Sequence, residues 1–184
     1  FKVILVGDSS VGKTSLALRF LGKKWSNTRA NTDVDVALHN MEVRGELVRL
    51  TIWDTAGTER FRSLATQFYR RARGAILETF DSLREWYSEL EKQATSPMVK
   101  VVVGNKIDKE SSREVRTSEG LSFAEDMDSL FIETSLEWGR NVDNLFVELG
   151  GDMLDNAAVD AEQNKETNVN LGAPQVAASQ GCRC

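Results

Sequence analysis

The chain has 184 residues, of which 41% are hydrophobic and 28% charged, and its formal net charge is −5 at pH 7. This length is enough for one domain with a well-buried core, and the negative charge argues against a nucleic-acid-binding protein, which usually carries a basic face. Cys182 and Cys184 are the two cysteines, so a disulfide framework within the domain is excluded and a reducing compartment is expected. No apolar run reaches the roughly eighteen residues of a membrane-spanning helix.

The first stretch predicts a phosphate-binding loop between a strand and a helix. Residues 1–6 form a short, mostly apolar run that is typical of a buried parallel strand, and residues 15–21 have the spacing of an amphipathic helix. Residues 7–14 between them read GDSSVGKT and match G-x-x-x-x-G-K-[ST]. Glycines let the main-chain N–H groups of such a loop approach a polyphosphate closely. The alternative is an ordinary glycine-rich turn followed by a chance Lys-Thr pair.

The rest of the chain alternates strands and helices. Strands are predicted at residues 34–43, 47–53, 75–77, 99–103 and 130–132, the first two being joined as a hairpin. Helices are predicted at about residues 61–69, 80–90, 118–126 and 142–154. This alternation predicts a parallel sheet with helices on both faces and ligands at the carboxyl ends of its strands. The segment from residue 156 onward is small, polar and aperiodic, so we expect a domain over residues 1–155 and a flexible tail over 156–184.

Three further motifs directly follow predicted strands: WDTAG at residues 53–57, NKID at 105–108 and ETSL at 133–136. The carboxylate of Asp54 suits a Mg²⁺ held through water, although a lone aspartate at a strand end is more often a cap or turn residue. A fixed carboxylate at Asp108 can accept from the ring N–H and the exocyclic amine of guanine, whereas adenine has no donors that match. Each such bond is worth about 1.5–3 kcal/mol, so the motif predicts a preference for GTP over ATP. An exposed polar turn is the alternative.

In their order along the chain, these motifs resemble those of the Ras superfamily of small GTPases over about residues 1–154. Residues 60–64 and 68–70 and the Cys-Arg-Cys ending resemble its Rab branch, and residues 105–110 and 114–131 resemble the subfamily numbered eighteen, called Rab-C in plants. The resemblance implies an α/β fold of the P-loop NTPase type, a small G domain with a mostly parallel six-stranded sheet flanked by helices.

The resemblance also implies the roles of individual residues. Catalysis of GTP hydrolysis would involve Lys13, Thr32, Gly57 and Thr58, and the Mg²⁺ ligands would be Thr14, Thr32 and Asp54. Contacts to GDP or GTP are implied for Gly7, Asp8, Ser9, Ser10, Val11, Gly12, Lys13, Thr14, Ser15, Trp25, Thr32, Gly57, Asn105, Lys106, Asp108, Ser135 and Leu136. Loss of the γ-phosphate would release the two loops that carry Thr32 and Gly57, and that change is the signal.

The partners that the resemblance implies are those of a membrane-anchored switch in vesicle or organelle trafficking. They are an exchange factor, a GTPase-activating protein, an escort protein and effectors, and no nucleic acid; a monomer is expected. Cys182 and Cys184 would carry two geranylgeranyl groups, which are enough for stable anchoring. The expected location is the cytoplasmic face of an intracellular membrane, with an escorted pool in the cytosol.

Several positions depart from the family pattern. Thr58 replaces the glutamine that orients the attacking water, so slow intrinsic hydrolysis is expected, and Leu136-Glu137 replaces Ala-Lys. About eight residues of the pattern are missing after Leu77, which predicts one shortened strand or, alternatively, a splice variant or gene-model error. A second hypothesis is therefore a GTP-binding or inactive scaffold without turnover. A third, a metabolic P-loop phosphotransferase, is disfavoured by the NKID motif and the Cys-x-Cys ending.

Overall fold

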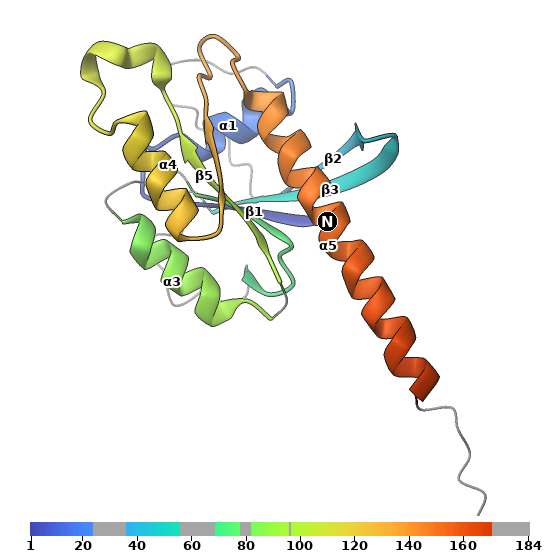
Figure 1. Ribbon diagram of the computed structural model, residues 1–184. Coiled ribbons are helices and arrows are strands. Elements are labelled where there is room, and N and C mark those ends of the chain that lie inside the picture. Colours follow the sequence, from blue (N-terminus) through green and yellow to red (C-terminus); the bar gives the residue numbers. More distant parts are fainter. Residues whose placement is uncertain (24–35, 56–68, 78–81, 96, 171–184) are drawn as a thin grey trace, which may run out of the picture. The chain divides into compact units, whose positions relative to one another are not determined.

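A six-stranded sheet forms the centre of the structure, a computed structural model that describes residues 1–23, 36–55, 69–77, 82–95 and 97–170 (Figure 1). The strand order is β2-β3-β1-β4-β5-β6. The strands are β1 (Lys2–Val6), β2 (Val36–Val43), β3 (Glu46–Asp54), β4 (Gly74–Leu77), β5 (Val99–Gly104) and β6 (Leu130–Glu133). The helices are α1 (Lys13–Phe20), α3 (Leu83–Gln93), the 3₁₀ helix η2 (Ile107–Ser112), α4 (Thr117–Asp126) and α5 (Val142–Asn170).

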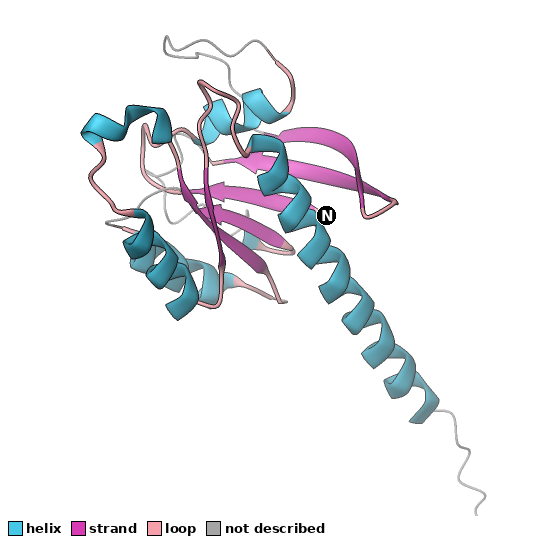
Figure 2. Ribbon diagram, turned by 45° about the horizontal axis from the view of Figure 1, so that its top comes forward, coloured by secondary structure: helices cyan, strands magenta, loops and turns pink. Residues whose placement is uncertain are grey.

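The pairing is parallel everywhere except between β2 and β3. These two strands form a hairpin whose turn consists of Arg44 and Gly45, with φ angles of 53° and 82°. Positive φ at both turn residues suits the right-handed twist of the strands, and glycine adopts it without strain. The predicted α/β fold and mostly parallel six-stranded sheet are thus confirmed (Figure 2).

Alternate residues of β1 point to opposite faces of the sheet, as in any strand. Ile4 and Val6 belong to the core cluster formed with side chains of α3 and α4. On the other face, Phe20 of α1 stacks on Phe146 of α5 with ring centroids 3.7 Å apart. Because β1 is buried on both faces, its sequence is continuously apolar from Val3 to Val6.

The short strand β4 confirms the prediction of one shortened strand. Its four residues pair with Val3 to Val6 of β1 on one side and with Val99 to Val102 of β5 on the other. On its other side β5 pairs with β6 from Val101 to Gly104, two residues beyond its register with β4. The sheet therefore remains continuous although β4 is short.

The last helix differs from the prediction. We expected it to end at about residue 154, which was wrong, because α5 continues to Asn170. Residues 156–170 contain neither glycine nor proline, and seven of the fifteen are Ala, Glu, Gln or Lys, whose helix propensity does not depend on an apolar period. Of the helices in the described part of the chain, none combines the length and the apolar character that crossing a bilayer requires.

Other predicted segments lie outside the described residues. These include nearly all of the helix expected at residues 61–69, and residues 78–81, which precede α3. The division into a domain at 1–155 and a tail at 156–184 stays a prediction.

We expect Gly120→Ala to destabilise the protein. Gly120 lies in α4, and a Cβ there would come within 2.6 Å of the Phe131 ring. An alanine normally stabilises a helix relative to glycine, but overpacking of this size costs about 1–3 kcal/mol. Urea unfolding of the purified protein measures the difference.

The matched control is the same substitution in a Phe131→Ala background, where the ring is absent. There Gly120→Ala should be neutral or stabilising. Equal destabilisation in both backgrounds would contradict the proposed clash.

Candidate nucleotide-binding site

The phosphate loop joins β1 to α1 and reverses the chain within a few residues. Gly7, Ser10 and Gly12 have φ angles of 144°, 67° and 128°. Glycine adopts the positive φ angles at positions 7 and 12 without strain. Helix α1 begins directly after Gly12, whose carbonyl accepts from the Leu16 N–H at 2.8 Å. The positive end of α1 therefore faces the loop, as the motif requires.

Lys13 folds back over its own loop. Its ammonium Nζ donates to the carbonyl oxygens of Gly7 at 2.8 Å and Asp8 at 2.7 Å. The residue is 3% exposed, and the two carbonyls compensate for the loss of water around the charge. A cation is thus held at the place where phosphate oxygens are expected.

The NKID motif lies against the phosphate loop. The Asn105 side-chain N–H donates to the Val11 carbonyl at 3.2 Å, and the Lys106 ammonium donates to the Ser10 carbonyl at 2.9 Å. Lys106 itself has a φ angle of 66°, which turns the chain sharply between β5 and η2. Two motifs more than 90 positions apart in the sequence are therefore joined directly.

The ETSL motif, which begins at the end of β6, supports the NKID motif. The Ser135 hydroxyl donates to Asp108 Oδ1 at 2.7 Å and accepts from the Trp138 N–H at 3.1 Å. The Thr134 hydroxyl donates to Asn105 Oδ1 at 3.1 Å. Thr134 and Ser135 have no exposed surface. The Asp108 carboxylate is consequently fixed by a buried neighbour and is not a mobile surface group.

Asp54 lies at the end of β3, next to the end of β1. The register pairs Leu5 with Asp54, and the Thr55 hydroxyl donates to the Leu5 carbonyl at 2.6 Å. Asp54 is 8% exposed, and Thr14 lies in the first turn of α1. A hydroxyl and a carboxylate of this kind are oxygen donors that suit Mg²⁺, so these two residues fit the predicted metal site.

Some predicted site residues are not tested by this geometry. Trp25, Thr32, Gly57 and Thr58 lie outside the described residues, as do both terminal cysteines. Leu136 is described and is 6% exposed. Its side chain is therefore part of the interior, and the predicted contact with a base would have to come from its backbone.

A cavity of about 520 Å³ lies beside the NKID motif. Its walls come from the end of β5, η2, the start of α4 and the end of β6, and include Asn105, Lys106 and Phe131. At its edge Arg113 donates to Glu133 at 2.7 Å. The hydrogen bonds to Glu133 and Glu110 raise the pKa of Arg113 above its usual value. Asn105 and Lys106 belong both to this cavity and to the predicted nucleotide site, whereas Asp108 and Ser135 do not line the cavity, so the two overlap only in part.

Sequence reasoning missed two residues that contact the phosphate loop. The Ser82 hydroxyl donates to Asp8 Oδ2 at 2.8 Å, and Trp86 Nε1–H donates to Asp8 Oδ1 at 3.0 Å. Trp86 repeats at helical spacing with apolar neighbours, a pattern that predicts a core residue. No local signal in the sequence indicates that its indole N–H reaches a residue 78 positions away.

The arrangement defines a class of protein: a P-loop nucleotide-binding domain of the small G-domain type, with the NKID motif held against its phosphate loop. The model of the Ras family matches residues 2–155, and the chain belongs to the Ras family of small GTPases, within its Rab branch.

Several Rab relatives are similar over most of their length. The Ras-related protein RABC2b of Arabidopsis thaliana is 42% identical over 158 residues, which cover 81% of this chain and 77% of the relative. Human Ras-related protein Rab-30 is 39% identical over 95% of this chain and 87% of its own length. For Ras-related protein Rab-1D of Dictyostelium discoideum the identity is 35%, over 98% of this chain and 93% of the relative. The similarity to the Rab branch and to plant Rab-C proteins is thus confirmed.

We expect Ser135→Ala to weaken GDP binding about tenfold, because the Asp108 carboxylate then loses a charge-assisted hydrogen bond that fixes its orientation. Equilibrium titration with fluorescent GDP measures the change. Ser129→Ala is the matched control, since the Ser129 hydroxyl also donates within the fold, to Met127, but outside the motifs. Equal loss of affinity in both variants would contradict the role given to Ser135.

Proposed function

We propose that the protein is a Rab-type switch that binds GDP and GTP with Mg²⁺, hydrolyses GTP slowly, and acts in vesicle or organelle trafficking. One observation carries the proposal. The Asn105 and Lys106 side chains hold the phosphate loop through the Val11 and Ser10 carbonyls, so a base-reading motif and a phosphate site form one unit. A single guanine nucleotide would occupy both.

Guanine selection is assigned to Asp108. The hydrogen bond from Ser135 orients its carboxylate, which would accept from the ring N–H and the exocyclic amine of guanine. Adenine would leave this carboxylate without matching donors, which is costly in a partly buried site.

The phosphates are assigned to the loop and to Lys13. In the described structure the Lys13 ammonium donates to two loop carbonyls. When a nucleotide binds, this ammonium would transfer its hydrogen bonds to phosphate oxygens, and the N–H groups of residues 8–15 would surround the β-phosphate. The cation is already in place, so binding requires little reorganisation.

Mg²⁺ is assigned to the Thr14 hydroxyl and, through water, to Asp54, with Thr32 as a further ligand. A bound Mg²⁺ would neutralise phosphate charge. Asp54 is nearly buried at the end of β3, and such a carboxylate gains stability from a nearby cation.

Hydrolysis is assigned to Lys13, Thr32, Gly57 and Thr58, and we propose a slow intrinsic rate because threonine cannot orient the attacking water as glutamine does. An activating partner would supply much of the charge stabilisation. The alternative function, a GTP-binding scaffold without turnover, is favoured by Thr58 and by the four-residue strand β4.

The remaining proposals concern the setting of the switch. The G domain would span residues 1–155, and residues 156–184 would connect it to a membrane through geranylgeranyl groups on Cys182 and Cys184. The protein would act as a monomer with an exchange factor, a GTPase-activating protein, an escort protein and effectors, on the cytoplasmic face of an intracellular membrane. Its membership of the Rab branch supports these assignments.

We expect fluorescent GDP to bind the purified chain in Mg²⁺ with a Kd below about 1 μM. Excess GTP should displace it, and the same concentration of ATP should not. Removal of Mg²⁺ with EDTA should speed its release, because the phosphate charge then loses a counterion.

Asp108→Ala is the control for this measurement. The variant should lose the preference for GTP over ATP, because the carboxylate that reads guanine is gone. Displacement of GDP by ATP from the unsubstituted chain would contradict guanine selection, and the absence of GDP binding would overturn the proposed function.

Single-turnover hydrolysis distinguishes the switch from the scaffold. We expect slow conversion of bound GTP that a cell extract accelerates, since an activating partner would complete the catalytic site. No conversion with or without the extract would favour the scaffold.

A further inference from the structure

We propose that Asp8, Ser82 and Trp86, here called the Asp8 clamp, hold the phosphate loop in its binding shape and set how long a nucleotide stays bound. Both carboxylate oxygens of Asp8 take part: Oδ2 accepts from the Ser82 hydroxyl at 2.8 Å and Oδ1 from Trp86 Nε1–H at 3.0 Å. The proposal rests on the proposed function, since it concerns the same nucleotide site.

The two donors of the clamp come from one rigid element. Ser82 is the N-cap residue of α3, and Trp86 lies one turn further along the same helix. Trp86 is 5% exposed and belongs to the core formed with β1, β4 and α4. Its packing fixes the position of the indole, so the N–H is held in place at little entropic cost. Hydrogen bonds to a carboxylate are also stronger than those between neutral groups.

The clamp is linked directly to the phosphate site through Asp8. While the Asp8 side chain is held by α3, its carbonyl accepts from the Lys13 ammonium at 2.7 Å. When Lys13 turns to bind phosphates, the Asp8 carbonyl loses the hydrogen bond from Lys13, but the Asp8 side chain keeps its bonds to Ser82 and Trp86. The clamp would therefore prevent the start of the loop from moving as Lys13 exchanges ligands, and a loop fixed in advance binds more tightly.

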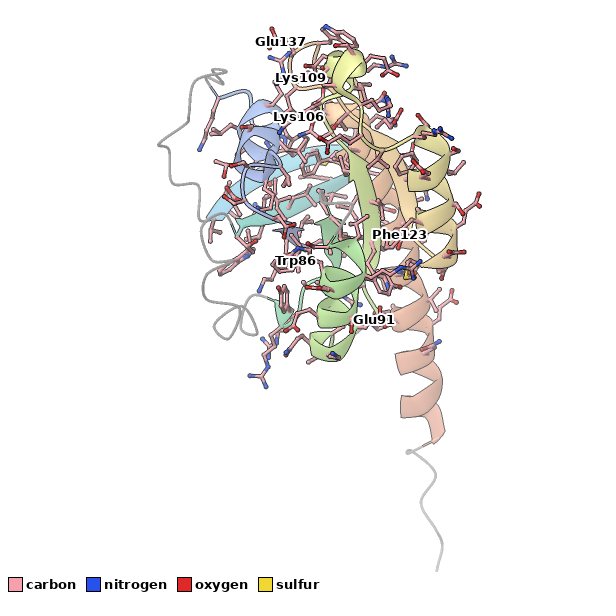
Figure 3. The ribbon with its side chains drawn as sticks, turned by 90° about the vertical axis from the view of Figure 1, so that its left-hand side faces the viewer. Trp86, Glu91, Lys106, Lys109, Phe123 and Glu137 are labelled. Carbon is pink, nitrogen blue, oxygen red and sulfur yellow. The ribbon has the colours of Figure 1, made fainter. Side chains whose placement is uncertain are left out.

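The two halves of the loop are held from different elements. Ser10 and Val11 are held by the NKID motif after β5, and Asp8 is held by α3. Trp86 lies toward the end of α3 that faces the loop carrying Lys106, whereas Glu91 lies further along the helix (Figure 3). A shift of the start of α3 would thus reach the phosphates through Asp8.

Trp86→Phe tests the proposal because it keeps an aromatic ring in the core and removes only the N–H donor. We expect the release of fluorescent GDP, chased with unlabelled GDP, to become about tenfold faster. Tyr87→Phe is the matched control. It removes a hydroxyl from the next residue of α3, which donates to the Met127 carbonyl away from the loop, and its release rate should stay within about twofold of the unsubstituted chain.

A double-mutant cycle separates the clamp from general destabilisation. Combined with Asp8→Ala, which removes both acceptor oxygens, Trp86→Phe should add little to the release rate, because the two residues act through one contact. Multiplied effects, or a Trp86→Phe release rate equal to that of the unsubstituted chain, would overturn the proposal. Equal acceleration by Trp86→Phe and Tyr87→Phe would also overturn it, since loss of stability would then be the cause.

NMR detects the contact between Trp86 and Asp8 independently of the nucleotide release rate. The Trp86 indole N–H resonance, assigned by its absence in Trp86→Phe, should move upfield in Asp8→Ala, because it loses a carboxylate acceptor. An unchanged resonance would contradict the clamp. Failure of the unsubstituted chain to bind GDP would instead contradict the proposed function, and the two failures are therefore distinguishable.

Discussion

The parallel pairing of β1 with both of its neighbours is the constraint on which the rest of the site depends. β3 and β4 pair with it at Lys2 to Leu5 and at Val3 to Val6. The phosphate loop therefore leaves the sheet at the same edge where the neighbouring strands end. Asp54 reaches this edge from β3, and the NKID motif reaches it from β5. The motifs meet because the strands run in one direction.

Main-chain carbonyls of the phosphate loop are the groups that join the parts of the site. Ammonium and amide donors from Lys13, Asn105 and Lys106 bind four of them. These bonds compensate for burying carbonyls at a turn where no strand pairs with them. The same contacts thus stabilise the loop at the proposed phosphate site.

The short strand β4 shows how the sheet accommodates a change in its middle. Four residues are enough to pair with the buried part of β1, and beyond Val102 the end of β5 is supported by β6. The NKID motif follows that end, so its position depends on β6, which pairs with β5 up to Gly104. Ser135 and Thr134, which follow β6, support the motif further. The NKID motif therefore keeps these contacts although β4 is short.

The sequence by itself determined the elements and the local chemistry. Apolar runs predicted the strands, and the glycine spacing around Lys13 predicted the loop, because both signals lie within a few residues. Tertiary structure decided which groups meet. The bonds from Trp86 to Asp8 and from Asn105 to Val11 join residues 78 and 94 positions apart, and no local period encodes such a contact. The length of α5 was missed for the opposite reason: the prediction relied on an apolar period that residues 156–170 lack, whereas no glycine or proline in that segment ends the helix.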